Sequence, residues 1–442
     1  NMSNKRKIIY AILLVVLVGL VYVGNFAIQY AYIGSSYNAK TVCSCMFVSG
    51  RDLENIKAEE LYAVPFSTVK VDEVNKSVTA NIYGLAETKA IYRKGLGCTL
   101  VNELSEEEIK KQPSVPSTDT LTENLLMADD LGGIDKIGLE KSLNEAFQEK
   151  DPQNVIRTRA IVVLHDGKII AEKYAPNIKP ETPLLGWSMT KSVTSAMIGL
   201  LVKEGKLDIK KSAPIAEWQN DERKKITIDH LLRMSSGLGF EENYAAPSDA
   251  TQMLFRKKGA GAYALLSKAA TEPDKVWSYS SGTSNILQEI IRRQFAFHAD
   301  YLAFPYQRLF HKIGMKSAVL EPDASGTFVG SSFMYATARD WAKFGQLYLQ
   351  DGVWNGERLF PEGWVKYSAT ETPHSDGKYA AHFWLDHQDK TFPQDAFMAV
   401  GFEGQYVTIV PSKNLVIVRL GCTPKDNFNH SALVKGIVAA VK

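Results

Sequence analysis

Strand-like patterns occur at two places far apart in the sequence, and a long helical stretch separates them. Residues 158–174 read as a β-hairpin with a turn at His165-Asp166-Gly167-Lys168, and strand patterns return over residues 381–422. Helical spacing of apolar residues dominates from residue 188 to about 350. The two strand regions predict one sheet built from both ends of an α/β (α+β) domain, with a large helical lobe inserted between them. A cleft between a sheet and such a lobe is a common place for catalysis.

The N-terminus carries a continuous apolar segment behind a basic cluster. Lys5-Arg6-Lys7 precedes residues 8–24, which are apolar or glycine, and no charged residue follows before Lys40. With the mildly polar residues after it, this segment is long enough to span a bilayer core of about 30 Å. Cations before the segment predict a cytoplasmic N-terminus and an exported remainder of the chain.

We expect residues 1–7 to be a cytoplasmic stub and residues 8–30 to be a single-pass anchor in the inner (cytoplasmic) membrane of a bacterium. The rest of the chain then lies in the periplasm or outside the cell. The alternative is a secreted protein whose signal peptide is cleaved. Such peptides have apolar cores of roughly 7–15 residues and end at a small-x-small site, and no clean site of that kind is present.

Four cysteines, Cys43, Cys45, Cys98 and Cys422, are candidates for disulfides in an exported chain. Cys43 and Cys45 are too close to pair comfortably, so Cys98 and Cys422 are their preferred partners. A zinc site is a competing interpretation, although no histidine lies near these cysteines in the sequence, and free buried thiols are a third one. We expect at least one disulfide and no metal. The net charge of +2, without a basic stripe, argues against nucleic-acid binding.

Residues 31–131 are expected to form an extension and linker before the main domain, which spans residues 132–442. Strand-like runs occur within residues 35–111, and residues 105–122 are polar and contain prolines, as a linker does. The extension either braces the main domain or covers its cleft, and both roles stay open at this point.

Ser188 and Lys191 lie three residues apart, behind Gly186-Trp187, at the start of a helical run. This spacing places both side chains on one face of a helix. A lysine amine there can take the proton of the serine hydroxyl, provided that burial and nearby polar groups lower its pKa. The same pattern recurs at Ser375 and Lys378, where a polar stretch with proline and glycine predicts a turn instead.

Two further segments carry residue types that suit acyl transfer. Tyr279, within Trp277-Ser278-Tyr279-Ser280-Ser281-Gly282, is a candidate proton shuttle, or a phenolate if an ammonium lowers its pKa. The glycines of Ala399-Val400-Gly401-Phe402-Glu403-Gly404-Gln405 let the backbone approach a ligand, so that an N–H there completes an oxyanion hole with that of Ser188. A lid aromatic and a simple β-turn are the corresponding alternatives. We expect two histidines to be structural and leave open whether one of three others reaches the cleft: His165 and His230, then His374, His382 and His387.

Taken in order with residues 226–244, these motifs resemble the serine β-lactamase-like hydrolases of the class C type. That superfamily includes D-alanyl-D-alanine carboxypeptidases, family VIII esterases and 6-aminohexanoate-dimer (nylon oligomer) hydrolases, and the last branch is the most similar. The resemblance implies a β-lactamase/transpeptidase-like fold, with an antiparallel sheet flanked by helices. It also implies Ser188 as nucleophile, Lys191 and Tyr279 as acid and base, and an oxyanion hole made by the backbone N–H groups of Ser188 and Phe402.

The same resemblance places Tyr244 in the substrate pocket, and we expect Trp187, Ser281 and Gly401 to contact the substrate as well. Ser281 stands where many β-lactamases and carboxypeptidases carry asparagine, and Ala399-Val400-Gly401 replaces Lys-Thr-Gly or His-Thr-Gly. The missing cation would face the carboxylate of a β-lactam or a D-Ala terminus, unless an arginine from elsewhere replaces it.

We therefore expect a membrane-anchored, exported serine hydrolase that cleaves esters or amides, with a small-molecule or peptide-like substrate and no cofactor. The alternatives are a D-amino peptidase, carboxypeptidase or β-lactamase acting on cell-wall-like substrates, and a non-catalytic penicillin-binding-like scaffold.

Overall fold

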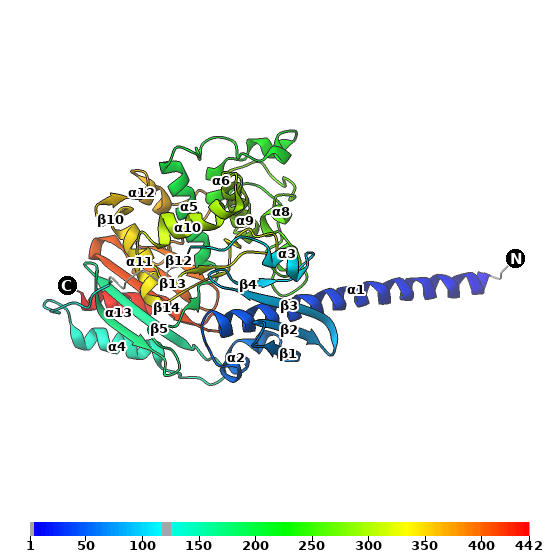
Figure 1. The fold of residues 1–442 in the computed structure, drawn as a ribbon, viewed down its shortest axis with the longest axis horizontal. Helices are drawn as coiled ribbons and strands as arrows, with labels where there is room; N and C mark the ends of the chain where they lie inside the picture. The colour runs from blue at the N-terminus through cyan, green and yellow to red at the C-terminus, as the bar shows by residue number, and fades with distance from the viewer. Residues whose placement is uncertain (1–3, 117–124, 442) are drawn as a thin grey trace.

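A five-stranded antiparallel sheet forms the centre of the molecule (Figure 1). The computed structural model describes residues 4–116 and 125–441. The strand order is β12-β13-β14-β5-β6, so strands from the end of the chain pair with the early hairpin through β14 and β5. The expectation of one sheet built from both ends is confirmed. The strands are β5 (Thr158–His165), β6 (Lys168–Tyr174), β12 (Phe397–Gly401), β13 (Gln405–Val410) and β14 (Leu415–Gly421).

Helices cover both faces of this sheet. Successive strand residues point to opposite faces, and along β5 Ile161 and Val163 join one apolar cluster while Val162 and Leu164 join the other. The first cluster is closed by α4 (Lys136–Phe147) and α13 (His430–Ala440), which contact each other. The second face is covered by α11 (Ala338–Leu349), which contacts β5, β13 and β14.

The expected helical lobe lies between β6 and β12 and occupies the top of Figure 1. α5 (Met189–Lys203) contacts both β12 of the sheet and α9 (Ser281–Arg292) of the lobe, and all but its last residues are buried. The start of α5 therefore lies where the sheet and the lobe meet. The remaining elements of this part are α6 (Ile228–Leu232), α7 (Asp249–Phe255), α8 (Ala260–Ala264), α10 (His298–Pro305), α12 (Trp364–Ala369), the short helical turns η2 (Ala216–Trp218), η3 (Glu222–Lys225) and η4 (Tyr306–Phe310), the small sheet of β7 (Leu184–Leu185), β8 (Val319–Leu320) and β9 (Met334–Ala336), and the hairpin of β10 (Val353–Trp354) and β11 (Glu357–Arg358).

The N-terminal extension contains a second antiparallel sheet, with strands in the sequential order β1-β2-β3-β4. The strand-like runs expected within residues 35–111 are present in this sheet, and α1 runs without a break over Asn4–Phe47, so residues 31–47 continue the apolar helix before the strands begin. The reason is tertiary, because this part of α1 packs along β2, β3 and β4, and such burial stabilises a helix more than its own propensity does. The other elements are α2 (Leu53–Glu59), η1 (Leu61–Ala63), β1 (Ser67–Asp72), β2 (Ser77–Ile82), β3 (Leu85–Arg93), β4 (Gly97–Leu100) and α3 (Glu106–Lys110).

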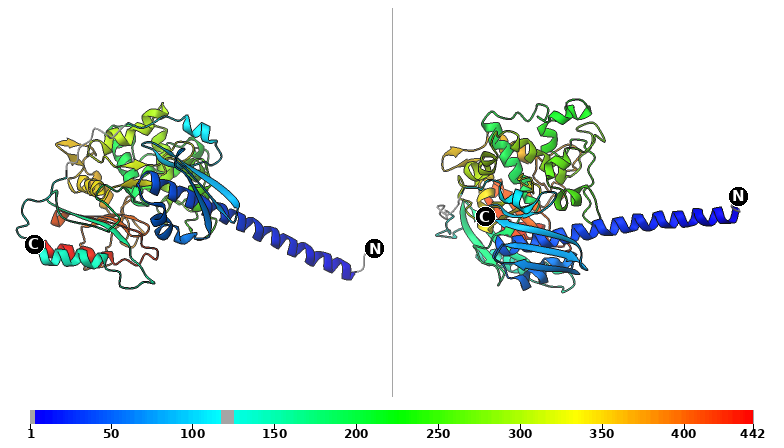
Figure 2. Two further views of the ribbon diagram at one scale, coloured as in Figure 1. Left: turned by 60° about the horizontal axis from the view of Figure 1, so that its bottom comes forward. Right: turned by 45° about the vertical axis from the view of Figure 1, so that its right-hand side comes forward.

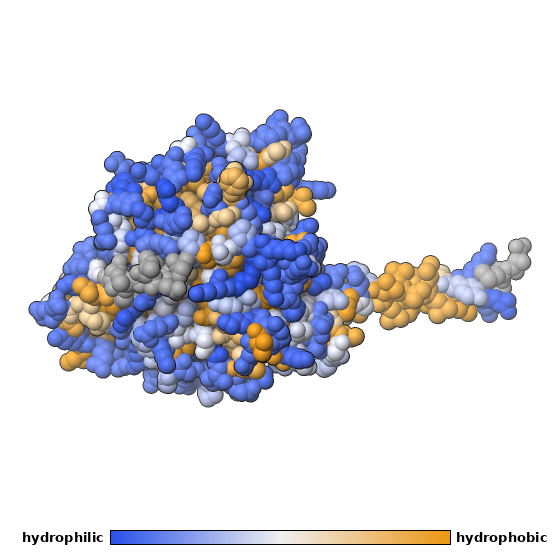
Figure 3. Space-filling model, in the orientation of Figure 1, coloured by the Kyte–Doolittle hydropathy of each residue, from blue (hydrophilic) through white to orange (hydrophobic). Residues whose placement is uncertain are grey.

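The first part of α1 leaves the folded body as an isolated rod, seen in both views of Figure 2. Its large apolar side chains are exposed from Ile8 to Tyr30, and they form the orange section of the rod in Figure 3. By length and composition this helix can cross a membrane. The predicted stub begins outside the described residues, at residues 1–3, and residues 117–122 of the predicted linker also lie outside them.

The second part of α1 is buried and joins the extension to the main domain. A disulfide links Cys43 of α1 to Cys98 of β4, while Cys45 and Cys422 are buried thiols. Lys40 forms a buried ion pair with Glu321, whose carboxylate also accepts from the Cys98 backbone N–H at 2.7 Å. One continuous apolar core includes residues of both units. The extension therefore braces the main domain.

Candidate active site

Ser188 and Lys191 face each other at the start of α5. Ser188 is the N-cap residue, yet its hydroxyl makes no capping bond and lies instead 3.0 Å from Lys191 Nζ. Trp187, just before it, has a φ of 47°, in the left-handed region that few non-glycine residues adopt. Backbone strain of this kind is concentrated at functional sites. The structure thus brings together the serine and the lysine whose spacing the sequence singled out.

The surroundings of Lys191 favour its neutral amine. The residue is 2% exposed, and burial lowers its pKa to about 8, although the Glu242 carboxylate opposes this shift. Nζ lies 3.0 Å from Ser188 Oγ, 3.0 Å from Ser281 Oγ and 2.9 Å from the Ser331 carbonyl oxygen. The carbonyl can only accept, and the Ser281 hydroxyl donates elsewhere, to Glu242. A neutral amine can donate to both, which leaves its lone pair for the hydroxyl of Ser188.

Tyr279 completes the group from the loop before α9. Its hydroxyl is hydrogen-bonded to the Ser188 side chain, and Lys191 Nζ lies 4.8 Å from the centre of its ring. The ring packs against Trp384 and Tyr379, with centroid distances of 5.2 and 5.9 Å. Burial raises the pKa of Tyr279 well above its usual value, and the hydrogen bond to Ser188 offsets only part of that shift. The residue is therefore a neutral phenol at neutral pH, not the phenolate that the sequence left open.

Glu242 organises the far side of Lys191, although no motif in the sequence singled it out. Its carboxylate accepts from the Ser281 backbone N–H at 2.8 Å, from the Ser281 hydroxyl at 2.5 Å and from the Tyr244 hydroxyl at 2.7 Å. Ser281 is the first residue of α9, where the positive end of the helix dipole favours an anion. The position of Glu242, two residues before Tyr244, was the only feature of the sequence that could have pointed to it. Acidic residues in loops are usually solvated, so this position alone does not indicate a role in the site. Ser281, expected to touch substrate, is fully buried and holds Lys191 instead.

The turn between β12 and β13 places Phe402 beside Trp187, with ring centroids 5.8 Å apart. Gly401 ends β12, and a Cβ built there would lie 2.1 Å from the carbonyl oxygen of Gly186, so only glycine permits this approach. Within the described residues, the backbone N–H groups of Ser188 and Phe402 donate to no protein acceptor. Both are therefore free to bind an oxygen atom of a ligand, as an oxyanion hole requires.

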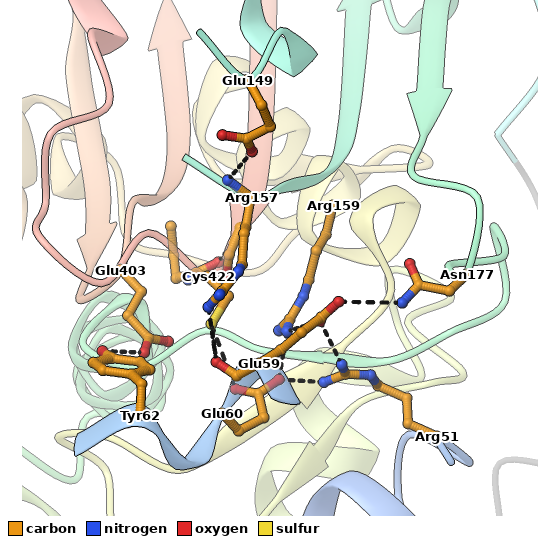
Figure 4. A network of polar contacts seen from close by, with 12 residues as sticks. Arg51, Glu59, Glu60, Tyr62, Glu149, Arg157, Arg159, Asn177, Glu403 and Cys422 are labelled. Atoms are coloured by element: carbon orange, nitrogen blue, oxygen red, sulfur yellow. Dashed lines mark hydrogen bonds and ion pairs between the residues drawn. The ribbon is translucent and has the colours of Figure 1, made fainter. Parts of the chain in front are cut away.

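A buried polar network fixes this turn to the N-terminal extension (Figure 4). Glu403, which follows Phe402, accepts from Tyr62 Oη at 2.7 Å and from Trp187 Nε1 at 3.1 Å. Burial, followed by the negative charge of Glu60, raises the pKa of Glu403. Glu60 itself is paired with two arginines, Arg51 and Arg159.

The same network contains a group that could be mistaken for a metal site. One ligand atom each of Glu60, Glu403 and Cys422 lies within 4.8 Å of the others. The carboxylates already have hydrogen-bond donors, from the arginines, the tyrosine and the indole named above. The arrangement is that of a structural network which holds the turn.

A cavity of about 720 Å³ opens onto Ser188 and is of the size that suits a small-molecule ligand. Tyr244, Tyr279, Trp187 and Gly401 line it, together with Phe402. Most of the other lining side chains are aromatic or aliphatic. Its charged lining residues are three acids, Glu242, Asp386 and Asp426, and among the described residues that line it there is no lysine, arginine or histidine. Among the described residues that line the cavity, no arginine takes the place of the cation of the Lys-Thr-Gly motif.

The remaining candidates lie outside this cavity. His382 is buried behind the site between Ser284 Oγ, at 2.8 Å, and the Leu232 carbonyl, at 2.7 Å. Burial lowers its pKa to about 3, so it is a neutral structural residue. Ser375 and Lys378 lie in a turn, with a backbone hydrogen bond of 3.1 Å between them, as predicted.

Comparison with known proteins agrees with this architecture. The family model described as Beta-lactamase matches residues 143–440. The 6-aminohexanoate-dimer hydrolase of Paenarthrobacter ureafaciens is 23% identical over 312 residues, which cover 64% of this chain and 78% of that protein.

Solved structures extend the likeness in three dimensions. A Bacillus anthracis protein, provisionally titled a 6-aminohexanoate-dimer hydrolase, gives a TM-score of 0.58 at 21% identity and covers 89% of this chain and 96% of its own. A family VIII carboxylesterase gives 0.53 at 15% identity, covering 72% of this chain and 98% of its own. At such identities the likeness shows the fold, which is the β-lactamase/transpeptidase-like fold that the motifs implied.

Proposed function

We propose, on the premise that this chain belongs to the β-lactamase family, that it is a serine hydrolase which cleaves ester or amide bonds through an acyl-enzyme on Ser188. The observation that carries the proposal is the set of hydrogen bonds around Lys191. When the amine is neutral, its two N–H bonds can be donated to the Ser281 hydroxyl and the Ser331 carbonyl, which leaves its lone pair for the Ser188 hydroxyl, 3.0 Å away. A serine is a weak nucleophile until a neighbouring base takes its proton.

Acylation begins when Ser188 Oγ attacks the substrate carbonyl and its proton moves to Lys191 Nζ. A base with a pKa of about 8 is partly deprotonated at neutral pH and strong enough to accept the proton in the transition state. The carbonyl oxygen becomes negatively charged between the backbone N–H groups of Ser188 and Phe402. Each donor of this kind contributes about 3–4 kcal/mol to stabilising the transition state.

Tyr279 then protonates the leaving alcohol or amine. A neutral phenol hydrogen-bonded to Ser188 has a proton to give at the position where the leaving group departs, and the proton that Lys191 took from Ser188 then restores the phenol. Water then enters in place of the leaving group and attacks the acyl carbon, while Tyr279 and Lys191 take its proton and pass it to Ser188 Oγ. The acid is thereby released and the serine hydroxyl is restored.

The lining of the cavity supports a substrate without a carboxylate near the scissile bond. Three carboxylates and no cation among the described lining residues would repel a β-lactam or a D-Ala terminus. The proposal is therefore an esterase or amidase in preference to a β-lactamase or carboxypeptidase. We further propose that residues 8–30 anchor the enzyme in the inner membrane of a bacterium, with the catalytic domain on the exported side.

The test is a panel of p-nitrophenyl esters and linear amides given to the purified full chain in detergent. We expect a burst of p-nitrophenol equal to the enzyme concentration, and its loss in Ser188→Ala. A non-catalytic scaffold would give no burst from the wild-type protein, and equal labelling of wild type and Ser188→Ala by a fluorophosphonate would show that Ser188 is not the nucleophile.

A further inference from the structure

The apolar helix that can cross a membrane also forms one wall of the catalytic cavity. Tyr30, Ile33, Gly34 and Tyr37 of α1 line the same cavity as Ser188. These positions follow the i, i+3, i+4, i+7 spacing of a single helix face. Tyr37 stacks on Trp187, the residue before the nucleophile, with parallel rings 6.4 Å apart.

The cavity begins at the point where α1 changes from exposed to buried. Tyr30 is 41% exposed and ends the run of exposed apolar side chains, whereas Ile33 is 8% exposed and belongs to the core. Seven residues of helix separate Tyr30 from Tyr37, which at 1.5 Å per residue is about 10 Å. The cavity therefore extends from the end of the membrane-compatible segment to the nucleophile.

The β2–β3 hairpin adds an apolar surface beside the same point. Tyr83 and Leu85 at its tip are 79% and 64% exposed, and Tyr83 stacks on the exposed Phe66 with a centroid distance of 6.0 Å. Ser35 of α1 donates to the carbonyl of Ala86 at 2.6 Å, which fixes this tip next to the helix where it leaves the body (Figure 2). Exposed aromatic side chains at such a place are typical of proteins that rest on a membrane interface.

From these observations we propose that the substrate is a long-chain fatty acyl ester or amide with an uncharged or cationic polar part, which enters the cavity from the bilayer. Its acyl chain lies along the α1 face and its carbonyl reaches Ser188. The inference rests on the proposed hydrolase function and names its substrate class. The three lining carboxylates exclude an anionic head group by repulsion.

The reaction is a hydrolysis in two steps, acylation of Ser188 and then release of the acyl group by water. Ser188 Oγ bonds to the acyl carbon while the bond to the alcohol or amine breaks, and that group leaves with a proton. Water then adds to the acyl carbon, so that the free fatty acid is released and the serine recovers its hydrogen.

The activity test uses the full chain inserted in phosphatidylcholine nanodiscs. Umbelliferyl acetate and umbelliferyl palmitate are compared by kcat/KM, and we expect palmitate to be preferred at least tenfold. Ala63, an exposed residue of η1 that lines the cavity, is changed to tryptophan to narrow it, and the preference for palmitate should fall at least tenfold. Ala58→Trp, at an exposed alanine of α2 that is not among the lining residues, is the matched control and should keep the wild-type ratio.

To test whether the substrate comes from the bilayer, umbelliferyl palmitate is placed either in the nanodisc that holds the enzyme or in separate nanodiscs. A much faster reaction in the shared disc supports entry from the bilayer, and equal rates would overturn it. A preference for umbelliferyl acetate would overturn the acyl-chain assignment. So would an equal effect of Ala63→Trp and Ala58→Trp on the ratio of the two kcat/KM values.

A binding measurement separates this inference from the proposed function. Trp187 lines the cavity and can report on a bound acyl chain by its fluorescence. The apolar N-terminal segment contains no tryptophan, because Trp187 is the first one in the sequence. A monoacylglycerol with a brominated chain, added to discs that hold Ser188→Ala, should quench fluorescence, and Trp187→Phe should reduce that quenching. If the brominated lipid quenches the fluorescence of Ser188→Ala but the wild type hydrolyses no substrate, the hydrolase proposal alone is overturned. If the wild type hydrolyses umbelliferyl acetate but the brominated lipid causes no quenching, the lipid assignment alone is overturned.

Discussion

The indole N–H of Trp187 donates a 3.1 Å hydrogen bond to the carboxylate of Glu403. Trp187 precedes the nucleophile, and Glu403 follows the residue whose backbone N–H forms the second half of the proposed oxyanion hole. This single contact therefore fixes the two halves of the hole relative to each other. Tyr62 Oη, 2.7 Å from the same carboxylate, links that geometry to the N-terminal extension.

Replacing Glu403 by leucine should lower kcat at least about tenfold with a smaller change in KM, because loss of one oxyanion donor costs about a hundred- to a thousandfold. Tyr62 and Trp187 donate to different oxygens of the Glu403 carboxylate, so Glu403→Gln keeps only one of the two acceptors and should lie between the leucine variant and the wild type. Steady-state kinetics on a p-nitrophenyl ester measure both. If the leucine variant kept full kcat while folding normally, the positioning role of Glu403 would be refuted.

The kcat/KM of the enzyme should rise with pH and level off above about 8, because only neutral Lys191 accepts the serine proton and its pKa is about 8. The negative charge of Glu242 raises that pKa, so Glu242→Gln should move the rising limb to lower pH. Asp386→Asn also removes a lining carboxylate, but one that is not among the groups shifting Lys191, and serves as the control. A limb that stayed in place in Glu242→Gln would contradict this electrostatic coupling.

Tyr279→Phe should slow the hydrolysis of amides far more than that of p-nitrophenyl esters. Its proton is needed by a poor leaving group such as an amine, and general acids of this kind contribute about a hundred- to ten-thousandfold. p-Nitrophenolate leaves without a proton. The ratio of amide to ester kcat/KM is the readout, and an equal loss on both substrates would assign Tyr279 to positioning Ser188 only.

Removing the disulfide should destabilise the chain by about 2–4 kcal/mol, since it closes a loop between residues 55 apart in sequence. Thermal unfolding of Cys43→Ala/Cys98→Ala should therefore start at a lower temperature than that of the wild type. Reducing agent should lower the wild-type Tm and leave the double variant unchanged. Cys45→Ala, which removes a neighbouring buried free thiol, should respond to reducing agent like the wild type; if reductant left the wild-type Tm unchanged, the disulfide would have no stabilising role.

Much of the fold could be predicted because its signals are local. The hairpin of β5 and β6 follows from alternating apolar residues around an Asp-Gly turn, and α5 follows from helical spacing after Ser188. The exposed apolar part of α1 is equally local, since its signal is a continuous run of apolar residues. The Ser188/Lys191 contact at 3.0 Å is a property of three-residue spacing on a helix.

Other features depend on residues that the chain brings together only when it folds. Glu242 reaches Ser281 across 39 positions and Tyr62 reaches Glu403 across 341, and no periodicity in the sequence encodes such pairs.

The sequence by itself determined that this chain has a serine beside a lysine at the start of a helix, a sheet built from both ends and an apolar N-terminal segment. Only the tertiary structure decided that the pKa of Lys191 is lowered and that of Tyr279 is raised, because burial shifts both. It also decided that α1 continues past the apolar segment to line the cavity of Ser188. Packing against a sheet formed later in the chain stabilises this continuation of the helix, and that information lies in contacts and not in the residues of the helix itself.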